Sequence, residues 1–201
     1  EYVQKIKKTV TTTGARGNIY DRNGELLAYN KLSYNVTITD VGYYKKSNDR
    51  NNMYYRLVKI LNKHGEKIEG DFLIAVNEFY YTTSSDSARL GFIRDMYGLK
   101  SVDQLDDKSG KYPSDITAEE MVAKRMDMYG LDVLTDESGN PIELTNSEKI
   151  DLINIRYEMG KRRYRRFEAT VISTNVSEET KVDIVENTAS LIGVDVENDT
   201  L

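Results

Sequence analysis

The sequence contains no cysteine and only one histidine, His64. The absence of cysteine excludes disulfides, thiolate catalysis and cysteine-ligated metal sites. His64 falls at the end of a helical pattern, where a cation complements the helix dipole, so we predict a capping or surface role for it. Any metal site would therefore have to be built from oxygen ligands alone.

Long apolar runs and an excess of basic charge are also missing. No run approaches the roughly 18 apolar residues of a membrane-spanning helix, and the first ten residues lack the apolar core of a signal peptide. The chain has 28 basic and 33 acidic side chains, a net charge of −5, which argues against general binding of nucleic acids or anionic membranes. It opens without methionine in a polar, strand-like segment, so we expect any membrane anchor to lie upstream.

Loop motifs that bind cations or phosphates do not occur either. If Gly110 or Gly139 were the sixth position of an EF-hand, Leu105 or Leu134 would stand first, where a carboxylate is required. Nothing matches G-x-x-x-x-G-K-[ST] or G-x-G-x-x-G. We therefore predict no cofactor and no metal.

What the chain does contain is enough apolar material to fold. Apolar residues make up 39% of the 201 residues, and fifteen tyrosines argue against disorder. This length accommodates one large domain or two small ones.

The two ends of the sequence read as strands. Apolar and polar residues alternate over 34–39, and shorter extended segments cover 6–13, 18–20 and 26–29. This period of two predicts antiparallel strands with one solvated face. Further strands are predicted at 167–174 and 194–196.

Helices are predicted between and after these strands. The apolar spacing predicts helices over 49–64 and 87–97, and capping boxes at 117–120 and 145–148 open two more. Ser177 is predicted to cap a last helix that ends at Gly193. The apolar stripe of that helix comprises Val182, Val185, Ala189 and Ile192.

Strands at both ends with helices between them indicate the α+β class. We expect a discontinuous antiparallel-strand pedestal from residues 1–40 and 165–201. Residues 41–164 would form a mainly helical inserted head, with 65–116 its least regular part.

The segment 16–28 carries more charge than a tight turn requires. Asn23 and Gly24 stand between two apolar runs, the strongest short-range signal for a hairpin, because both residues tolerate positive φ. The turn does not explain Arg16, Asp21 and Arg22. Such side chains make fixed, multi-donor contacts between domains, so we predict a docking surface here.

A basic run covers residues 161–166, with Tyr164 inside it. It could bind phosphate or RNA, but no second strand carries the aromatic residues that stack on bases. In an acidic protein we favour a solvated face or intramolecular salt bridges.

These motifs resemble a known family. The pattern Arg16-Gly17-x-Ile19-x-Asp21-Arg22-Asn23-Gly24-x-x-Leu27-Ala28 resembles the signature that opens the pedestal, or dimerisation, region of class B penicillin-binding proteins. A second block follows in the expected order, from 164–179 through Glu186 to 191–194, with Ile192 where the family usually has proline. Residues 129–130 and 155–157 are more weakly similar to the elongation-type subgroup.

The resemblance implies a non-catalytic role for this chain. The family's transpeptidases use a serine nucleophile in S-x-x-K, and no serine here has lysine three residues later. The chain would be the extracytoplasmic scaffold of a peptidoglycan D,D-transpeptidase whose catalytic domain is absent from it. An upstream transmembrane helix would anchor the protein at the outer face of the cell membrane.

The resemblance also implies partners and site residues. The partners are the transpeptidase domain of the same protein, a SEDS-type glycan polymerase and a second copy of the chain. The structural site comprises Arg16, Gly17, Asp21, Arg22, Asn23, Gly24 and Glu186. Glu186 is the expected partner of the two arginines.

Two other classes of function stay open at this point. One is a stand-alone module, either a binding domain for an unknown ligand or a hydrolase with an oxygen-only metal site. The other is a nucleic-acid binder that uses 161–166.

Overall fold

We describe the protein from a computed structural model, which covers residues 19–28, 32–161, 163–165 and 167–200. The strand predicted over 6–13 and the site residues Arg16 and Gly17 lie outside these ranges.

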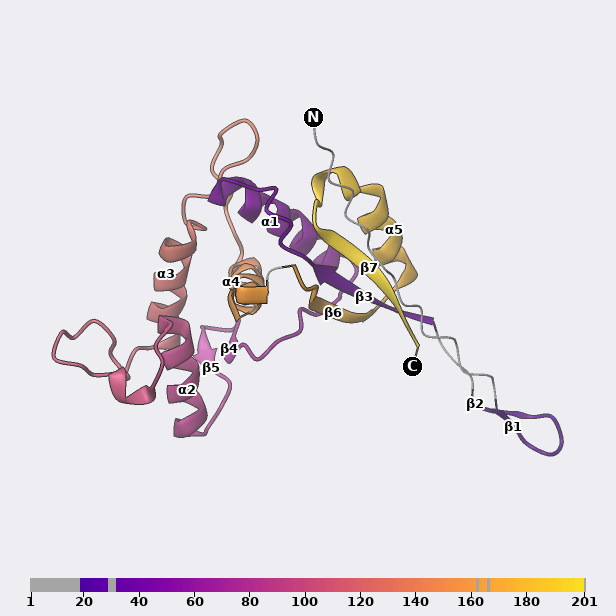
Figure 1. Ribbon diagram of the computed structural model, residues 1–201, viewed down its shortest axis with the longest axis horizontal. Coiled ribbons are helices and arrows are strands. Elements are labelled where there is room, and N and C mark those ends of the chain that lie inside the picture. The colour runs from indigo at the N-terminus through magenta and orange to yellow at the C-terminus, as the bar shows by residue number, and fades with distance from the viewer. Residues whose placement is uncertain (1–18, 29–31, 162, 166, 201) are drawn as a thin grey trace.

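A three-stranded antiparallel sheet joins the two ends of the chain. Strand β3 (Leu32–Ile38) lies in the middle, between β6 (Thr170–Val176) and β7 (Val194–Thr200). Ile38 faces Thr170 on one side and Val194 on the other. The α+β class is confirmed, and so is the expected pairing of N-terminal with C-terminal strands (Figure 1).

Both faces of β3 are buried. Val36 and Ile38 belong to the apolar core, but Ser33 and Thr37 on the opposite face are also only 2% and 1% exposed. The predicted solvated face is therefore wrong for this strand. An alternation of apolar and polar residues does not distinguish a solvated face from a buried face that is lined by small hydroxyl side chains, because such side chains pack readily into a sheet.

Five α-helices complete the described part of the chain. They are α1 (Ser47–Lys63), α2 (Asp86–Tyr97), α3 (Ala118–Tyr129), α4 (Asn146–Lys161) and α5 (Glu178–Glu186). The shorter elements are β1 (Ile19–Tyr20), β2 (Leu26–Ala28), β4 (Ile74–Ala75), β5 (Tyr80–Tyr81) and the 3₁₀ turns Val102–Gln104, Arg163–Arg165 and Thr188–Ser190.

The predicted capping boxes form as expected. The Thr117 hydroxyl accepts from the Glu120 amide at 3.2 Å, and the Glu120 carboxylate accepts in return from the Thr117 amide at 2.9 Å. Thr145 and Glu148 make the same pair at the start of α4. These reciprocal bonds satisfy amides that the first turn of a helix cannot pair internally.

Helix α5 differs from its prediction in length and in orientation. It ends at Glu186, and its buried residues are Thr180 and Ile184. Val182 and Val185 are 47% and 58% exposed, so the predicted buried stripe is wrong. Thr180 faces inward because its hydroxyl is hydrogen-bonded to Glu66, and this contact sets the rotation of a short helix.

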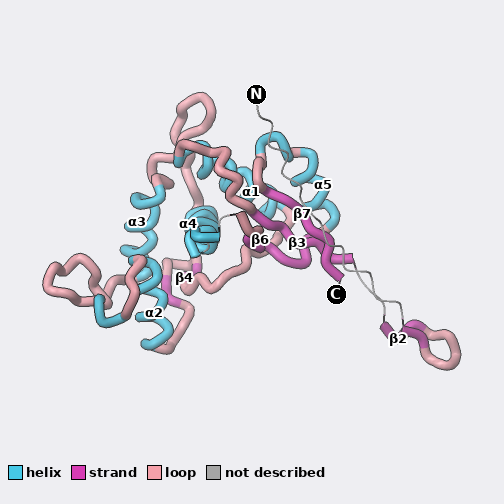
Figure 2. The backbone as a smooth tube through the Cα atoms, in the orientation of Figure 1, coloured by secondary structure: helices cyan, strands magenta, loops and turns pink. Residues whose placement is uncertain are grey.

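Helix α1 links the sheet to the other helices. It packs on α4 and on α5, and one apolar cluster runs from β3 and β6 through α1 to α2, α3 and α4. In Figure 2, α2, α3 and α4 lie to one side of α1, while the sheet and α5 lie to the other.

Gly193 supplies a close backbone approach at the start of β7. Its φ is +93°, and a Cβ there would lie 2.5 Å from the Thr39 carbonyl oxygen. The Thr39 amide donates to the Gly193 carbonyl at 2.8 Å. The prediction that Gly193 ends the last helix is wrong, because α5 ends at Glu186, and Gly193 instead allows this close backbone approach.

We predict that Gly193→Ala lowers the free energy of unfolding by about 2 to 4 kcal/mol, because a steric clash adds to the strain of positive φ. Gly24→Ala is the matched control, since Gly24 has φ +83° but a Cβ added to it would meet nothing within 4 Å; we expect about 1 kcal/mol from it. Urea unfolding measures both. Equal losses would contradict the close approach at Gly193.

Candidate functional site

The C-terminal end of α1 meets the N-terminal end of α5, which joins the helical middle of the chain to its sheet (Figure 1). We call the polar cluster at this contact the joint. It consists of Lys63, His64, Glu66, Ser177, Thr180 and Asp183.

Glu66 holds the first turn of α5. Its Oε1 accepts from the Ser177 amide and hydroxyl, both at 2.8 Å, and from the Thr180 hydroxyl at 2.7 Å. Burial alone raises the pKa of Glu66, but these hydrogen bonds outweigh it, so the pKa lies below its usual value. The carboxylate is therefore bound in its ionised form.

Asp183 contacts two side chains at the C-terminal end of α1. Lys63 Nζ and His64 Nε2 each lie 2.7 Å from Asp183 Oδ2. The Lys63 bond, and then the His64 bond, lower the pKa of Asp183. His64 ends α1 as predicted, and it also contacts α5, which its position in the sequence does not reveal.

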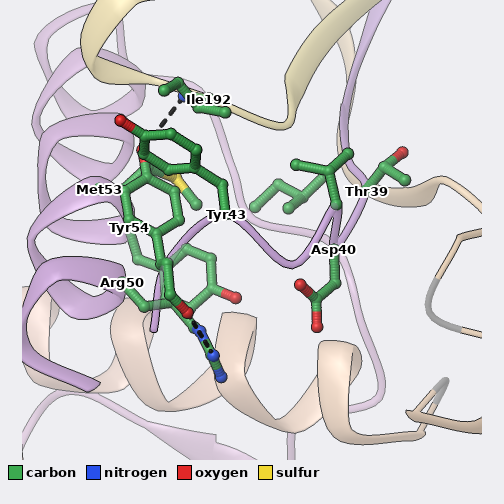
Figure 3. Close-up of a pocket in the computed structure, with 10 residues that line it drawn as sticks. Thr39, Asp40, Tyr43, Arg50, Met53, Tyr54 and Ile192 are labelled. Carbon is green, nitrogen blue, oxygen red and sulfur yellow. Dashed lines mark hydrogen bonds between the residues drawn. The ribbon is translucent and has the colours of Figure 1, made fainter. Parts of the chain in front are cut away.

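A second contact joins the segment between α5 and β7 to the segment before α1. The Tyr44 hydroxyl accepts from the Ile192 amide at 3.2 Å and donates to the Ser190 carbonyl at 3.4 Å. Arg50 Nη2 donates to the Tyr44 carbonyl at 3.0 Å (Figure 3). Burial raises the pKa of Tyr44, which keeps its hydroxyl a neutral donor and acceptor.

The cavity beside Tyr44 is too small for a ligand. Thr39, Asp40, Arg50, Met53 and Tyr54 are among the residues that line it (Figure 3). The centre of a water molecule can range over about 10 Å³ there, so it admits a single water at most. This part of the contact is structural.

The β1–β2 hairpin contains four of the seven predicted site residues, Asp21, Arg22, Asn23 and Gly24. Asp21 Oδ1 accepts from the Asn23 amide at 2.8 Å and the Glu25 amide at 2.7 Å, while the Gly24 amide donates to the Asp21 carbonyl at 3.1 Å. Within 19–28 only Gly24 has positive φ. The turn is thus type I around Arg22 and Asn23 with Gly24 as a bulge, and the expected two-residue Asn23-Gly24 turn is wrong.

Two other turns in the chain repeat this arrangement. At Asp136 the side chain accepts from the amides of Ser138 and Asn140, and the Gly139 amide donates to its carbonyl. The turn from Asp107 to Gly110 has the same backbone bond. Aspartate in D-x-x-G therefore stabilises the turn itself, so the turn does explain Asp21, and the docking role predicted for this residue stays a prediction.

Arg22 is not needed by the turn. The equivalent positions hold Glu137 and Lys108, and Arg22 is exposed without a hydrogen bond or ion pair in the described part of the chain. Ile19, Tyr20, Leu26 and Leu27 are each at least half exposed, and Figure 1 shows the hairpin set apart from the three-stranded sheet.

The structure does not bring Arg22 to Glu186. Glu186 is exposed at the end of α5, whereas the hairpin lies away from that helix (Figure 1). The predicted pair is wrong for Arg22, and Arg16 lies outside the described residues. The carboxylates that make the contact between α1 and α5 are instead Asp183, which lies on α5, and Glu66, which follows α1.

Two cations of the basic run form internal ion pairs. Lys161 Nζ lies 2.8 Å from Glu158 and 3.1 Å from Asp71, and Arg165 lies 3.3 Å from Glu168. The predicted intramolecular role is confirmed for these two cations; Arg162 and Arg166 lie outside the described ranges.

Within the described ranges, no three acidic or histidine side chains form a group that could hold a metal ion. None of the helices described there is both long and apolar enough to cross a membrane.

Comparisons with known proteins place the chain in context. A family model described as "Penicillin-binding Protein dimerisation domain" matches residues 11–201. A search of curated proteins found no match. Among solved structures the chain is similar to penicillin-binding protein 2B from Streptococcus pneumoniae, strain 5204, with 16% identity and a TM-score of 0.39. That match covers 94% of this chain and 25% of the other, so the chain spans about a quarter of that protein's length.

We predict that Glu66→Gln lowers the free energy of unfolding by about 1 to 3 kcal/mol, because a charged acceptor of three hydrogen bonds is lost. Glu69→Gln is the matched control, since Glu69 accepts only one side-chain bond, from Thr174 at 2.8 Å. Denaturant unfolding of both variants tests this; equal effects would contradict the special position of Glu66.

The joint also predicts a dependence on pH. The folded-state pKa values of Asp183 and Glu66 lie below the ordinary 3.8 and 4.5, so their stabilisation is complete above these values and is lost as pH falls through the folded pKa values. The stability difference between the wild type and the double variant Glu66→Gln, Asp183→Asn should therefore shrink as pH falls below about 4. A difference that stays constant from neutral to acid pH would rule this out.

Proposed function

The chain belongs to the family of penicillin-binding protein dimerisation domains, and we propose that it positions the catalytic domain of a peptidoglycan D,D-transpeptidase without doing chemistry itself. The observation that carries the proposal is the β1–β2 hairpin. Its turn is held by Asp21, while its apolar side chains and Arg22 face outward. A preorganised element with apolar and cationic groups is suited to docking, because it loses little entropy on binding.

The proposal divides the chain by role. Residues 1–40 and 165–201 form the pedestal that presents the hairpin, and residues 41–164 form the head. The joint supports this division, because it fixes the orientation of α1 against α5 through Glu66 and Asp183. A head held in this way lies at a fixed distance and direction from the pedestal, so partners that bind the two parts would also be held at a fixed separation.

Membership of the family suggests a setting for the protein. We place the protein at the outer face of the cell membrane, held by a transmembrane helix upstream of this chain, in the elongation-type subgroup. The proposed partners are the catalytic domain of the same protein, a SEDS-type glycan polymerase and, as the family's description suggests, a second copy.

The competing functions have less support. Nucleic-acid binding through 161–166 would require free cations, whereas Lys161 and Arg165 are engaged in ion pairs. For a stand-alone hydrolase, no observation in the described residues identifies a reacting group, and the cavity beside Tyr44 is too small for a ligand.

We predict that Arg22→Ala weakens docking of the catalytic domain by about 1 to 3 kcal/mol, the range for hydrogen bonds to charged groups. The measurement is the coupling between domains in unfolding of the longer protein that contains both. Lys108→Ala is the matched control, because Lys108 follows the aspartate of a similar D-x-x-G turn. If the two variants leave the coupling equally unchanged, the hairpin does not dock through Arg22.

A further inference from the structure

A groove of about 710 Å³ runs along α3 in the head. One wall is α3, and the rest of the lining is formed by the turn after α3, the segment before α4 and Phe79 from the turn between β4 and β5. Its lining residues are Phe79, Glu119, Val122, Ala123, Met126, Leu131, Asp132, Pro141, Ile142, Glu143, Leu144 and Lys149. None of them belongs to the hairpin or to the joint.

The floor of the groove is apolar. Val122, Met126 and Leu131 are buried members of the core that also line the groove. Ala123 is exposed at its edge, and its small side chain leaves the floor accessible. The apolar contact area of the groove comes from Ala123 and Pro141, which are exposed, and from Phe79, Ile142 and Leu144, which are partly buried.

The rim of the groove is acidic. Glu119, Asp132 and Glu143 are exposed, and within the described ranges their carboxylates make no ion pair or hydrogen bond. The single cation of the lining, Lys149, is partly buried and lies 3.5 Å from the Asn146 side chain. Three free negative charges around an apolar floor attract a cationic partner and repel an anionic one.

Strained backbone holds one wall in place. Glu78 and Phe79, in the turn between β4 and β5, have φ of +62° and +39°. Positive φ is unfavourable for a bulky side chain such as phenylalanine, and such strain concentrates at binding sites. Here it coincides with the placement of Phe79 in the groove lining.

We infer that this groove docks a basic, amphipathic peptide segment of a partner protein, with apolar side chains on the floor and lysine or arginine at the rim. A small polar ligand fits less well, because no buried polar groups converge there. Nucleic acid and anionic lipid are repelled by the rim, and a second copy of a chain with net charge −5 is disfavoured. The inference goes beyond the proposed function and uses different residues.

The test measures binding of a fluorescein-labelled leucine–lysine peptide of about 14 residues, with leucine at helical spacing on one face. The same peptide with glutamate in place of lysine is the probe control. Anisotropy titrations at two salt concentrations report affinity and its electrostatic part. We expect the lysine peptide to bind, more weakly at high salt, and the glutamate peptide to bind at least tenfold less tightly.

Two pairs of variants localise the binding. The triple variant Glu119→Gln, Asp132→Asn, Glu143→Gln is compared with Glu25→Gln, Glu186→Gln, Glu197→Gln, which changes the net charge equally at exposed sites elsewhere. Ala123→Lys is compared with Ala189→Lys, because both alanines are exposed. We expect about tenfold weaker binding for each groove variant and less than a twofold change for each control.

Thermal unfolding verifies that all four variants are folded, and backbone NMR shifts show where the wild-type chain binds the peptide. Shifts confined to α3 and 131–149 support the inference. Equal affinity of groove and control variants would overturn it, and so would shifts centred on another face. Self-association that Ala123→Lys abolishes would assign the groove to a second copy, which also overturns it.

Discussion

The pairing of β3 with both C-terminal strands is the constraint on which the rest of the structure depends. Ile38 lies between Thr170 and Val194, so the chain leaves β3 and returns to β6 at the same end of the sheet. Residues 39–169 therefore form one long connection between the end of β3 and the start of β6, which are neighbours in the sheet. The contact of α1 with α5 arises because this connection begins beside the segment where β7 starts.

The joint uses the ends of two helices in a complementary way. The carbonyl end of α1 carries partial negative charge and presents Lys63 and His64, while the amide end of α5 carries partial positive charge and binds Glu66. Each carboxylate therefore accepts donors from the other element, and Glu66 also complements the dipole of α5. Two short polar clusters can in this way hold a helical head that shares its apolar core with the sheet.

Local signals in the sequence predicted local structure well. The Thr117 and Thr145 boxes form because their partners lie three residues away, and the strand pairing of the two ends followed from the positions of the alternating segments. The hairpin at 19–28 was also located from its sequence, but its turn type was mispredicted, because the Asp21 carboxylate accepts amides of its own turn and within 19–28 only Gly24 takes positive φ.

The joint could not be found in this way. Asp183 lies 120 residues from Lys63, and Ser177 lies 111 residues from Glu66. No local pattern identifies such partners. The face of α5 was mispredicted for the same reason, since the bond between Thr180 and Glu66 outweighs the apolar spacing of Val182 and Val185. Burial of Ser33 and Thr37 likewise depends on what covers the sheet, which the strand's own sequence does not encode.

The adjacency of Ile38 and Thr170 has a consequence for how such proteins diversify. Because the head leaves and re-enters the sheet one strand spacing apart, roughly 5 Å, heads of different length and shape can be grafted there without shifting the register of any strand. The entropy of closing a longer excursion rises only slowly with its length. What a new head must reproduce is a helix end that offers a carboxylate to Ser177 and cations to Asp183, so the sheet can stay constant while the outward-facing part of the molecule changes.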